Sequence, residues 1–425
     1  MKRIAYLFLV LFPLMATSCL MEEKEVFDQT PAERMDAFLS EYKEILESSE
    51  NGWLFEYYPE ANQSYGGYAY VLKFQNGMVT AYFELADEEA VSTFKMTSDD
   101  GPVLSFDTYN ENLHFFAEPS PDMYQGLQGD YEYKILGKSD DNSEIYLIGR
   151  KSGNNLTLKK FAGEDPFEYF GKSAEISSAM MAPSYSIKIN ENSTPCSISD
   201  NVLYYELVVK EATETTEAEI ETVECAFCYT DTGISFYEPV EIGGVEYTSL
   251  KYGEETLVSE DGKVVISLVF PPISETFFKN QWYLHKTGLG EYGAGKFNAV
   301  SQSLYAGEKE SLLLVNIGTY FAANYGNVWG MHFMTDAGYA GVVAFDAEAV
   351  ADDKITLKYN PANNQGNGNY YMTYYFGGIV DTFCGEEGKT FTLTPDNPKS
   401  PFAVMLTDDS DPTNTITLSR SLTTY

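Results

Sequence analysis

Four cysteines could carry redox or metal chemistry, and two of them, Cys225 and Cys228, have CxxC spacing. A redox pair needs a helix start that lowers a thiol pKa, whereas residues 223–229 have the pattern of a strand. In a strand these two sulfur atoms point to opposite faces. The pattern favours buried structural thiols, and it leaves open a disulfide with Cys196 or Cys384, or a redox or metal role.

The three histidines give no metal centre, because His114, His285 and His332 stand far apart in the sequence. We expect His332 to be a structural residue, on the strand face opposite Met331 and Phe333.

Acidic side chains form two short clusters that could supply oxygen ligands to Ca²⁺. The clusters are Asp140, Asp141 and Glu144, and Asp408, Asp409 and Asp411. Neither has the EF-hand pattern, so both indicate solvated turns. The glycine-rich segment 288–295 lacks the lysine of a phosphate-binding loop and indicates a flexible loop. We predict no catalytic residue, no metal and no cofactor, although a hydrolytic carboxylate pair would not be visible in a sequence.

Aromatic side chains could instead bind a ligand. Tyr65, Tyr68, Tyr70 and Trp329 could present flat rings to a glycan or another nutrient, as could the tyrosines of 369–376. The alternative, which the alternation favours, is that these rings cover strands, with one set buried and the other at the surface.

The amino terminus has the features of a bacterial lipoprotein signal. Lys2 and Arg3 precede an apolar run at 4–15, which is too short to span a bilayer, and small residues lead directly to Cys19. We expect residues 1–18 to be removed and Cys19 to be lipidated, which anchors the chain firmly. An ordinary secretory signal is the alternative. Residues 19–29 form an acidic tether, typical of surface export, although the periplasmic face stays open.

Composition limits the remaining functions. The chain has 425 residues, a formal charge of −37, 44% hydrophobic residues and 15% aromatic residues. Such a charge disfavours binding to nucleic acid or docking on anionic lipid by charge alone. Loss of residues 1–18 removes Lys2 and Arg3 and no acid, which makes the charge −39.

One helix and many short strands are expected to position these residues. Thr30-Pro31-Ala32-Glu33 predicts a helix start with a capping box, and Asn51-Gly52 ends the helix. The apolar period then becomes two, which predicts a mainly β protein with few helices. Gln75-Asn76-Gly77 predicts a hairpin turn. The first domain, 30–185, should be an antiparallel meander or a lipocalin-like barrel.

A second β-rich domain should cover 186–425 and could divide near 271. The segment 163–200 is richer in Ser, Gly, Pro and Asn, which places the boundary near 185. Residues 274–286 could form a helix, and residues 370–376 are among the predicted strands.

Several segments resemble one uncharacterised family, known only as a domain of unknown function. The resemblance is strongest over 26–170 and rests on residues 30–34, 50–53, 57–59, 65–68, 98–110 and 114–116. Such proteins are outer-membrane lipoproteins often encoded beside starch-utilisation-type uptake systems. The resemblance implies a nutrient-uptake setting, with a TonB-dependent channel and its capture lipoprotein as partners, and it transfers no catalytic residues.

We therefore expect a lipid-anchored, surface-exposed protein of the outer membrane that assists nutrient capture or uptake without catalysis. The alternatives are a surface hydrolase acting on the same nutrient and a structural subunit of a receptor complex. Convergent buried carboxylates in a pocket would favour the enzyme.

Overall fold

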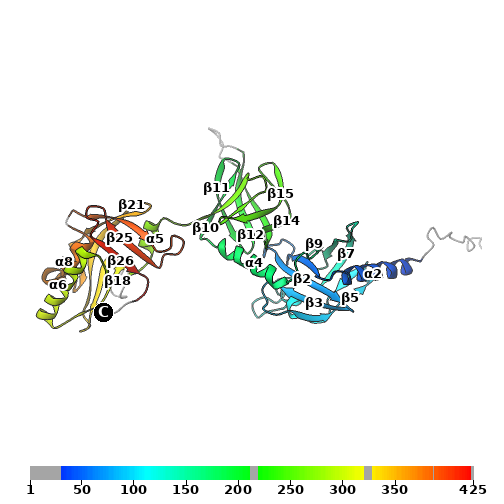
Figure 1. The fold of residues 1–425 in the computed structure, drawn as a ribbon, viewed down its shortest axis with the longest axis horizontal. Coiled ribbons are helices and arrows are strands. Elements are labelled where there is room, and N and C mark those ends of the chain that lie inside the picture. The colour runs from blue at the N-terminus through cyan, green and yellow to red at the C-terminus, as the bar shows by residue number, and fades with distance from the viewer. Residues whose placement is uncertain (1–29, 211–218, 320–327, 386, 423–425) are drawn as a thin grey trace, which may run out of the picture. The chain divides into compact units, whose positions relative to one another are not determined.

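A computed structural model describes residues 30–210, 219–319, 328–385 and 387–422 (Figure 1). Cys19, the signal peptide and the acidic tether lie outside the described residues. The chain divides into two compact units. Of the described residues, the first unit holds those within 30–180 and 186–267, and the second holds those within 181–185 and 268–422.

The first helix, α2 (Pro31–Glu47), begins as the sequence predicts. Thr30 caps it, and both hydrogen bonds of the capping box with Glu33 are present. Its apolar face buries Tyr42, Ile45 and Leu46. The indole N–H of Trp53 donates to the Leu46 carbonyl at 2.9 Å, which ties the helix end to the first strand.

The first sheet has nine strands in the order β4-β3-β2-β1-β9-β8-β7-β6-β5. Neighbouring strands in this sheet are antiparallel, and the hairpin at Asn76-Gly77 has the positive φ angles that such a turn requires. The strands are β1 (Trp53–Tyr57), β2 (Tyr68–Gln75), β3 (Met78–Phe83), β4 (Ala90–Thr93), β5 (Lys95–Thr97), β6 (Val103–Ser105), β7 (Glu132–Lys138), β8 (Glu144–Gly149) and β9 (Asn155–Lys160). The expected mainly β, antiparallel fold is confirmed, and this sheet is open rather than a closed barrel, with two runs of consecutive strands joined where β1 pairs with β9.

Two helices interrupt the strands of this unit: α3 (Glu111–His114) and α4 (Pro166–Ala179). The sequence interpretation did not foresee α4, which lies in the segment expected to be a boundary. Asp165 caps it, Pro166 occupies its first position, and Phe170, Ser173 and Ile176 form its buried face. Contacts with the sheet and barrel therefore stabilise a helix whose polar composition hid it.

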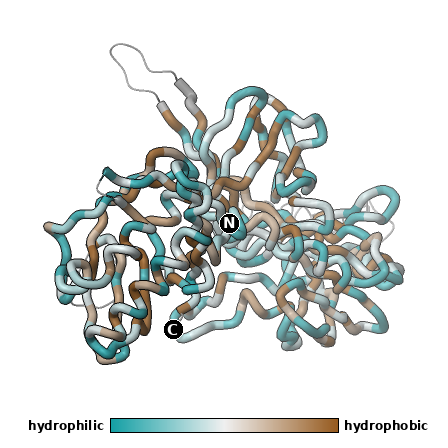
Figure 2. The backbone as a smooth tube through the Cα atoms, turned by 60° about the vertical axis from the view of Figure 1, so that its left-hand side comes forward, coloured by the Kyte–Doolittle hydropathy of each residue, from teal (hydrophilic) through white to brown (hydrophobic). Residues whose placement is uncertain are grey.

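The next eight strands form a closed barrel, in which residues alternate between hydrophobic and hydrophilic (Figure 2). Leu203, Phe227, Leu257 and Ile266 are each 0% exposed. The strands are β10 (Ser184–Ile189), β11 (Asn192–Ser199), β12 (Val202–Lys210), β13 (Glu219–Thr230), β14 (Gly233–Ile242), β15 (Val245–Gly253), β16 (Thr256–Val258) and β17 (Val264–Val269).

The second unit is built on another nine-stranded sheet, in the order β20-β19-β18-β26-β25-β24-β22-β21-β23, with β20 also paired to β21. Its strands are β18 (Trp282–Leu289), β19 (Leu312–Gly318), β20 (Gly330–Thr335), β21 (Ala340–Ala351), β22 (Lys354–Tyr359), β23 (Gln365–Gly366), β24 (Lys389–Pro395), β25 (Ala403–Asp408) and β26 (Thr415–Ser419). Its helical segments are α5 (Ile273–Lys279), α6 (Glu291–Glu308), η1 (Pro361–Asn363), α7 (Gly368–Tyr371), η2 (Met372–Phe376) and α8 (Gly377–Phe383).

Two predictions for this unit were wrong. Segment 288–295 is not a flexible loop, because it ends β18 and starts α6, with Gly290 at the N-cap. Residues 370–376 are not a strand but helical, including the π-helix η2. The wider π turn places Tyr371 and Phe376, five residues apart, together in the core, while Tyr370 and Tyr374 are exposed. The expected helix at 274–286 is partly present, as α5, and a strand follows it.

Candidate binding cleft

The first sheet and the barrel meet at a junction that backbone hydrogen bonds fix. The Gly67 N–H donates to the Phe227 carbonyl at 2.9 Å, and the Asn201 amide donates to the Gly67 carbonyl at 3.0 Å. The Tyr58 hydroxyl donates to the Ser235 carbonyl at 3.2 Å. Cys228, on β13, is 0% exposed and belongs to the hydrophobic core of the first sheet. The two parts therefore share one core, and clefts along their junction have fixed walls.

Gly66 is required where the chain passes this junction. Its φ is +63°, and a Cβ atom there would lie 2.3 Å from the Asp200 carbonyl oxygen. A Cβ atom on Gly67 would lie 2.5 Å from the Tyr58 ring. These glycines let two backbones approach closely, so the Tyr-Gly-Gly-Tyr segment is a structural contact.

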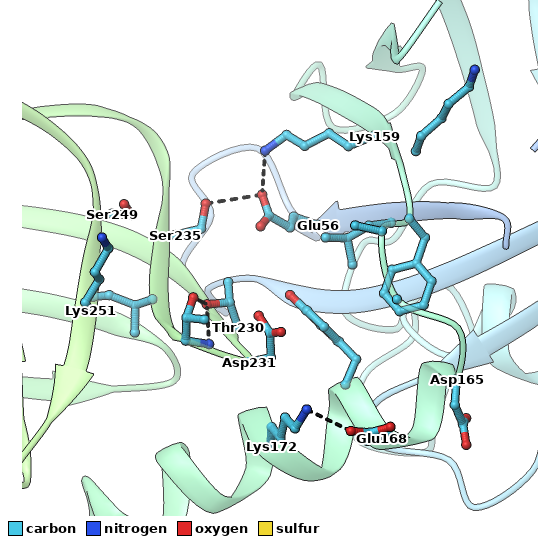
Figure 3. A pocket seen from close by; sticks show the side chains of 18 of the residues that line it. Glu56, Lys159, Asp165, Glu168, Lys172, Thr230, Asp231, Ser235, Ser249 and Lys251 are labelled. Atoms are coloured by element: carbon cyan, nitrogen blue, oxygen red, sulfur yellow. Dashed lines mark hydrogen bonds and ion pairs between the residues drawn. The ribbon is translucent and has the colours of Figure 1, made fainter.

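A cleft of about 490 Å³, called the lysine cleft below, opens along the junction (Figure 3). The first sheet, residues 161–165 and α4 form one side, and the 230–235 turn and β15 form the other. Its walls carry charges of both signs: Glu56, Glu164, Asp165, Glu168, Asp231, Lys159, Lys160, Lys172 and Lys251. Four lysines are a high density in a chain with only 27 lysines and arginines. The cleft therefore suits a small polar ligand with charged groups.

Glu56 is the most buried residue among the ion pairs of this cleft. Its side chain is 14% exposed, and its Oε2 accepts from Lys159 Nζ at 3.3 Å and from the Ser235 hydroxyl at 3.2 Å. Lys172 pairs with Glu168 at 2.8 Å, and this hydrogen bond raises the pKa of Lys172. Figure 3 shows Lys251 on the barrel side, across from Lys159. Ser235 thus faces a carboxylate and has no imidazole base, since no histidine lines the cleft.

A second cleft of about 320 Å³, called the Glu84 cleft below, lies elsewhere on the same junction. Its lining residues are Tyr68, Glu84, Leu85, Phe170, Ser173, Ala174, Ser177, Asp200, Asn201 and Tyr229. Burial raises the pKa of the Glu84 carboxyl group to about 8, although a backbone hydrogen bond from Ala69 opposes this shift. The side chain is partly exposed, so the cleft gives it access to solvent.

Strand register relates the two clefts. Ala69 on β2 pairs with Glu56 on β1, and the Glu84 N–H donates to the Ala69 carbonyl at 3.1 Å. Residues directly opposite one another share a sheet face, so Glu56 and Glu84 flank the small side chain of Ala69. Glu56 lines the lysine cleft and Glu84 lines the other cleft. These carboxylates are therefore near one another on the sheet without sharing a cleft.

The aromatic residues predicted to bind a ligand do not form one platform. Tyr70 is 2% exposed, stacks on Phe83 at 4.3 Å and donates to the Asn112 carbonyl, so burial leaves its ring no free face. Tyr65 is partly exposed beside Gly66, and Tyr68 is partly exposed and lines the Glu84 cleft.

Trp329 belongs to the second unit, as do the three rings packed around it. Those rings are Phe277, Phe278 and Phe345, with centroids 5.6–6.3 Å from the Trp329 ring.

The other chemical candidates are structural. Cys196, Cys225, Cys228 and Cys384 are free and buried, and burial raises the pKa of each thiol. His332 is fully buried and its Nε2 lies 3.0 Å from the Val328 carbonyl oxygen, while Met331 and Phe333 face the core from the same strand. Burial lowers the pKa of His332.

The acidic clusters form capped turns. Burial opposes ionisation of Asp408, but hydrogen bonds from Ser410 and Asn414 lower its pKa to about 2. Hydrogen bonds from Ser143 and Ser139 lower the pKa of Asp141 to about 2. Within the described residues, no three or more acids, histidines or cysteines gather to hold a metal ion.

Of the residues named from the sequence as ligand-binding candidates, Tyr68 lines the Glu84 cleft, whereas the charged residues of both clefts were missed. Glu56 was visible as a charge within the strand at 53–58, but the residue that contacts it, Ser235, lies 179 positions away. Alternation along β1 indicated that Glu56 faces away from Phe55, and it could not indicate what covers that face.

In the part of the chain that the structure describes, no helix is both long and apolar enough to cross a membrane. No curated protein matches the chain. Among solved structures, the crystal structure of the DNA polymerase III subunit beta from Pseudomonas aeruginosa is similar at 9% identity, covering 92% of this chain and 98% of that chain. Its TM-score of 0.11 does not indicate a shared fold. Residues 23–254, more than half of the chain, match the family described as "Domain of unknown function (DUF4302)", and the chain belongs to that uncharacterised family.

Proposed function

We propose that this protein is a lipid-anchored, non-enzymatic protein of the outer-membrane surface that assists nutrient capture by binding a small charged ligand in the lysine cleft. The observation that carries the binding role is the cleft itself. Hydrogen bonds and a shared core hold its two walls together, and it gathers four lysines of a strongly acidic chain. Preorganised walls reduce the ordering cost of binding.

The contacts of the carboxylates favour binding over hydrolysis. A glycosidase places two carboxylates on either side of one scissile bond, so both must reach the same cavity. Glu56 and Glu84 cannot form such a pair, because they line different clefts. Within the lysine cleft, Glu56 and Glu168 are each paired with a lysine, as suits a binding site more than an acid–base pair.

The cleft is tested by charge reversal of one lysine. Lys251→Glu alters the barrel wall of the lysine cleft, and Lys188→Glu makes the same change at an exposed barrel position outside it. A panel of charged sugars, amino acids and short peptides is screened by thermal shift, since a ligand raises the unfolding temperature by mass action. We expect a ligand that stabilises the wild type and Lys188→Glu but not Lys251→Glu. Equal stabilisation of both variants would contradict the assignment of the cleft.

The anchor is tested at Cys19. Cys19→Ala removes the sulfur that would carry lipid, whereas Ser18→Ala keeps a small residue before it. We expect the wild type and Ser18→Ala to incorporate an alkyne fatty acid and fractionate with outer membranes, and Cys19→Ala to do neither. A Cys19→Ala protein that stays in the outer membrane would refute lipid anchoring.

The uptake role predicts a partner. Mild crosslinking in native membranes should join the protein to a TonB-dependent channel and its capture lipoprotein, identified by mass spectrometry. Failure to recover such a channel, with the anchor intact, would contradict the accessory role while leaving ligand binding to be judged by the cleft variants.

A further inference from the structure

The Glu84 cleft differs from the lysine cleft in charge. No lysine or arginine is among its lining residues, whereas it carries the carboxylates of Glu84 and Asp200. Three aromatic rings, from Tyr68, Phe170 and Tyr229, complete the walls. The lysine cleft thus carries charges of both signs, whereas the Glu84 cleft carries only negative ones and should attract a cation.

Two of the other polar side chains on this wall, those of Ser173 and Asn201, already have partners. The Ser173 hydroxyl donates to the Phe170 carbonyl at 3.0 Å, and the Asn201 amide donates to the Gly67 carbonyl at 3.0 Å. Among the described residues, neither Glu84 nor Asp200 forms an ion pair with a lysine or arginine, and Glu84 is the more buried of these two carboxyl groups. The protein thus leaves the charge of the Glu84 carboxylate without a counter-ion.

That imbalance is energetically costly, because a half-buried carboxylate without a counter-ion is poorly solvated. A raised pKa is the expected consequence, and the pKa of Glu84 is raised to about 8. A cation in the cleft would restore the ionised form. Aromatic faces add to this attraction, since ring quadrupoles favour an organic cation more than they favour a strongly hydrated metal ion.

We propose that the Glu84 cleft binds a small organic ammonium ion, with the Glu84 carboxylate as its counter-ion and the rings of Tyr68, Phe170 and Tyr229 as its walls. The site is separate from the lysine cleft, so it stands or falls independently of the proposed function. Asp200 adds a second negative charge at the rim, which disfavours ligands that carry phosphate.

The test uses choline as the probe, because its quaternary ammonium group does not titrate. Its neutral isostere 3,3-dimethylbutan-1-ol has the same shape without the charge. Binding of both to the purified full chain is measured by isothermal titration calorimetry at pH 6, 7, 8 and 9. We expect choline to bind at least about tenfold more tightly than the isostere above pH 8.

The pH profile identifies the counter-ion. Below a pKa of about 8 the ionised fraction of Glu84 changes about tenfold per pH unit, so choline affinity should rise about tenfold from pH 6 to 7 and level off above pH 8. The titratable tyrosines and cysteine that interact electrostatically with Glu84 are Tyr58, Tyr68, Tyr70, Tyr169 and Cys228, and burial raises the pKa of each above this range. The carboxyl group of Asp200 lines the same cleft.

Matched variants complete the test. Glu84→Gln copies the neutral carboxyl group and should fold, yet it should lose at least about tenfold in choline affinity at pH 8.5 and show a flat pH profile. Glu88→Gln removes the same charge from an exposed position outside the cleft and should bind as the wild type does.

Three results would overturn the proposal. These are equal binding of choline and its isostere, unchanged choline binding by Glu84→Gln, and no binding of 10 mM choline at pH 8.5 (about the weakest affinity of interest). Tighter binding of phosphocholine than of choline would also overturn it, because that preference belongs to a lipid head-group site.

Discussion

The strongest test of the junction is the substitution Gly66→Ala. An L-residue in the left-handed region costs about 1–2 kcal/mol, and the gain from a stiffer unfolded chain returns about 0.4–1 kcal/mol. The added Cβ atom would also lie 2.3 Å from the Asp200 carbonyl oxygen and 2.7 Å from the Asn201 carbonyl oxygen. Both are backbone atoms of the barrel, so the sheet and barrel must separate locally.

That separation would break neighbouring hydrogen bonds. The bonds from the Gly67 N–H to Phe227 and from the Asn201 amide to Gly67 each contribute about 1 kcal/mol. Adding the backbone cost gives a loss of about 3 kcal/mol for Gly66→Ala. Gly77→Ala is the matched control, because its φ is +73° and nothing lies within 4 Å of its Cβ position. That variant should lose only about 1 kcal/mol.

Hydrogen exchange at increasing urea, read by mass spectrometry on peptides from β2 and β14, measures both variants. Gly66→Ala should lower the stability of both peptides by about 2 kcal/mol more than Gly77→Ala does, since both report one shared core. If the two variants lose the same stability, the close approach at Gly66 does not exist and the cleft walls are not fixed as described.

Three further outcomes are expected. Asn154→Ala should lower the free energy of unfolding in urea by about 2–3 kcal/mol, because the amide of this buried residue donates to the Tyr58 and Glu60 carbonyls at 2.9 and 2.7 Å. The control Asn62→Ala, at an exposed site, should change this free energy little. The pKa of Glu84 is raised to about 8 in the folded state, above its ordinary value of 4.5, so its protonation stabilises the native state. This contribution to the free energy of unfolding is fully present below pH 4.5 and is lost as the pH rises to 8. Glu84→Gln should thus match the wild type at pH 5 and be more stable at pH 9, and equal pH dependence would contradict the burial. In the native protein, thiol titration should find that none of the four described cysteines reacts fast, because all four are buried. In denaturant all four should react, and a fifth should react only if Cys19 carries no lipid. Rapid labelling of Cys225 in the native protein would contradict its burial.

Local patterns predicted the elements whose signals are local. The capping box at Thr30 and Glu33 fixes where α2 starts, and Asn76-Gly77 fixes a hairpin, because both depend on atoms within a few residues. The sequence interpretation missed the helix α6, because the residues at its start, 291–295, include two glycines, which have low helix propensity. Its stability comes from Phe297, Val300 and Leu304, which pack into the core of the second unit.

The clefts could not be predicted, because their walls come from distant segments. Sequence alternation placed Phe55 and Glu56 on opposite faces of β1, and this is what the structure has. Which element covers the Glu56 face depends on the barrel, whose β13 supplies Cys228 and whose β14 supplies Ser235. The role of Gly66 and Gly67, which lie between the tyrosines of 65–70, was hidden for the same reason, because they serve a contact with a segment more than 130 residues away.

Glu56, Ala69 and Glu84 lie side by side across the sheet, and their arrangement explains why one junction holds two clefts with different charged residues. Ala69 lies between Glu56 and Glu84 on the sheet and is 0% exposed, so a large residue at position 69 would have no room there. Lys159 then balances Glu56, while Glu84 has no lysine or arginine in its cleft. Because lysines line one cleft and not the other, the two sites should bind different ligands rather than divide the work of one hydrolytic reaction.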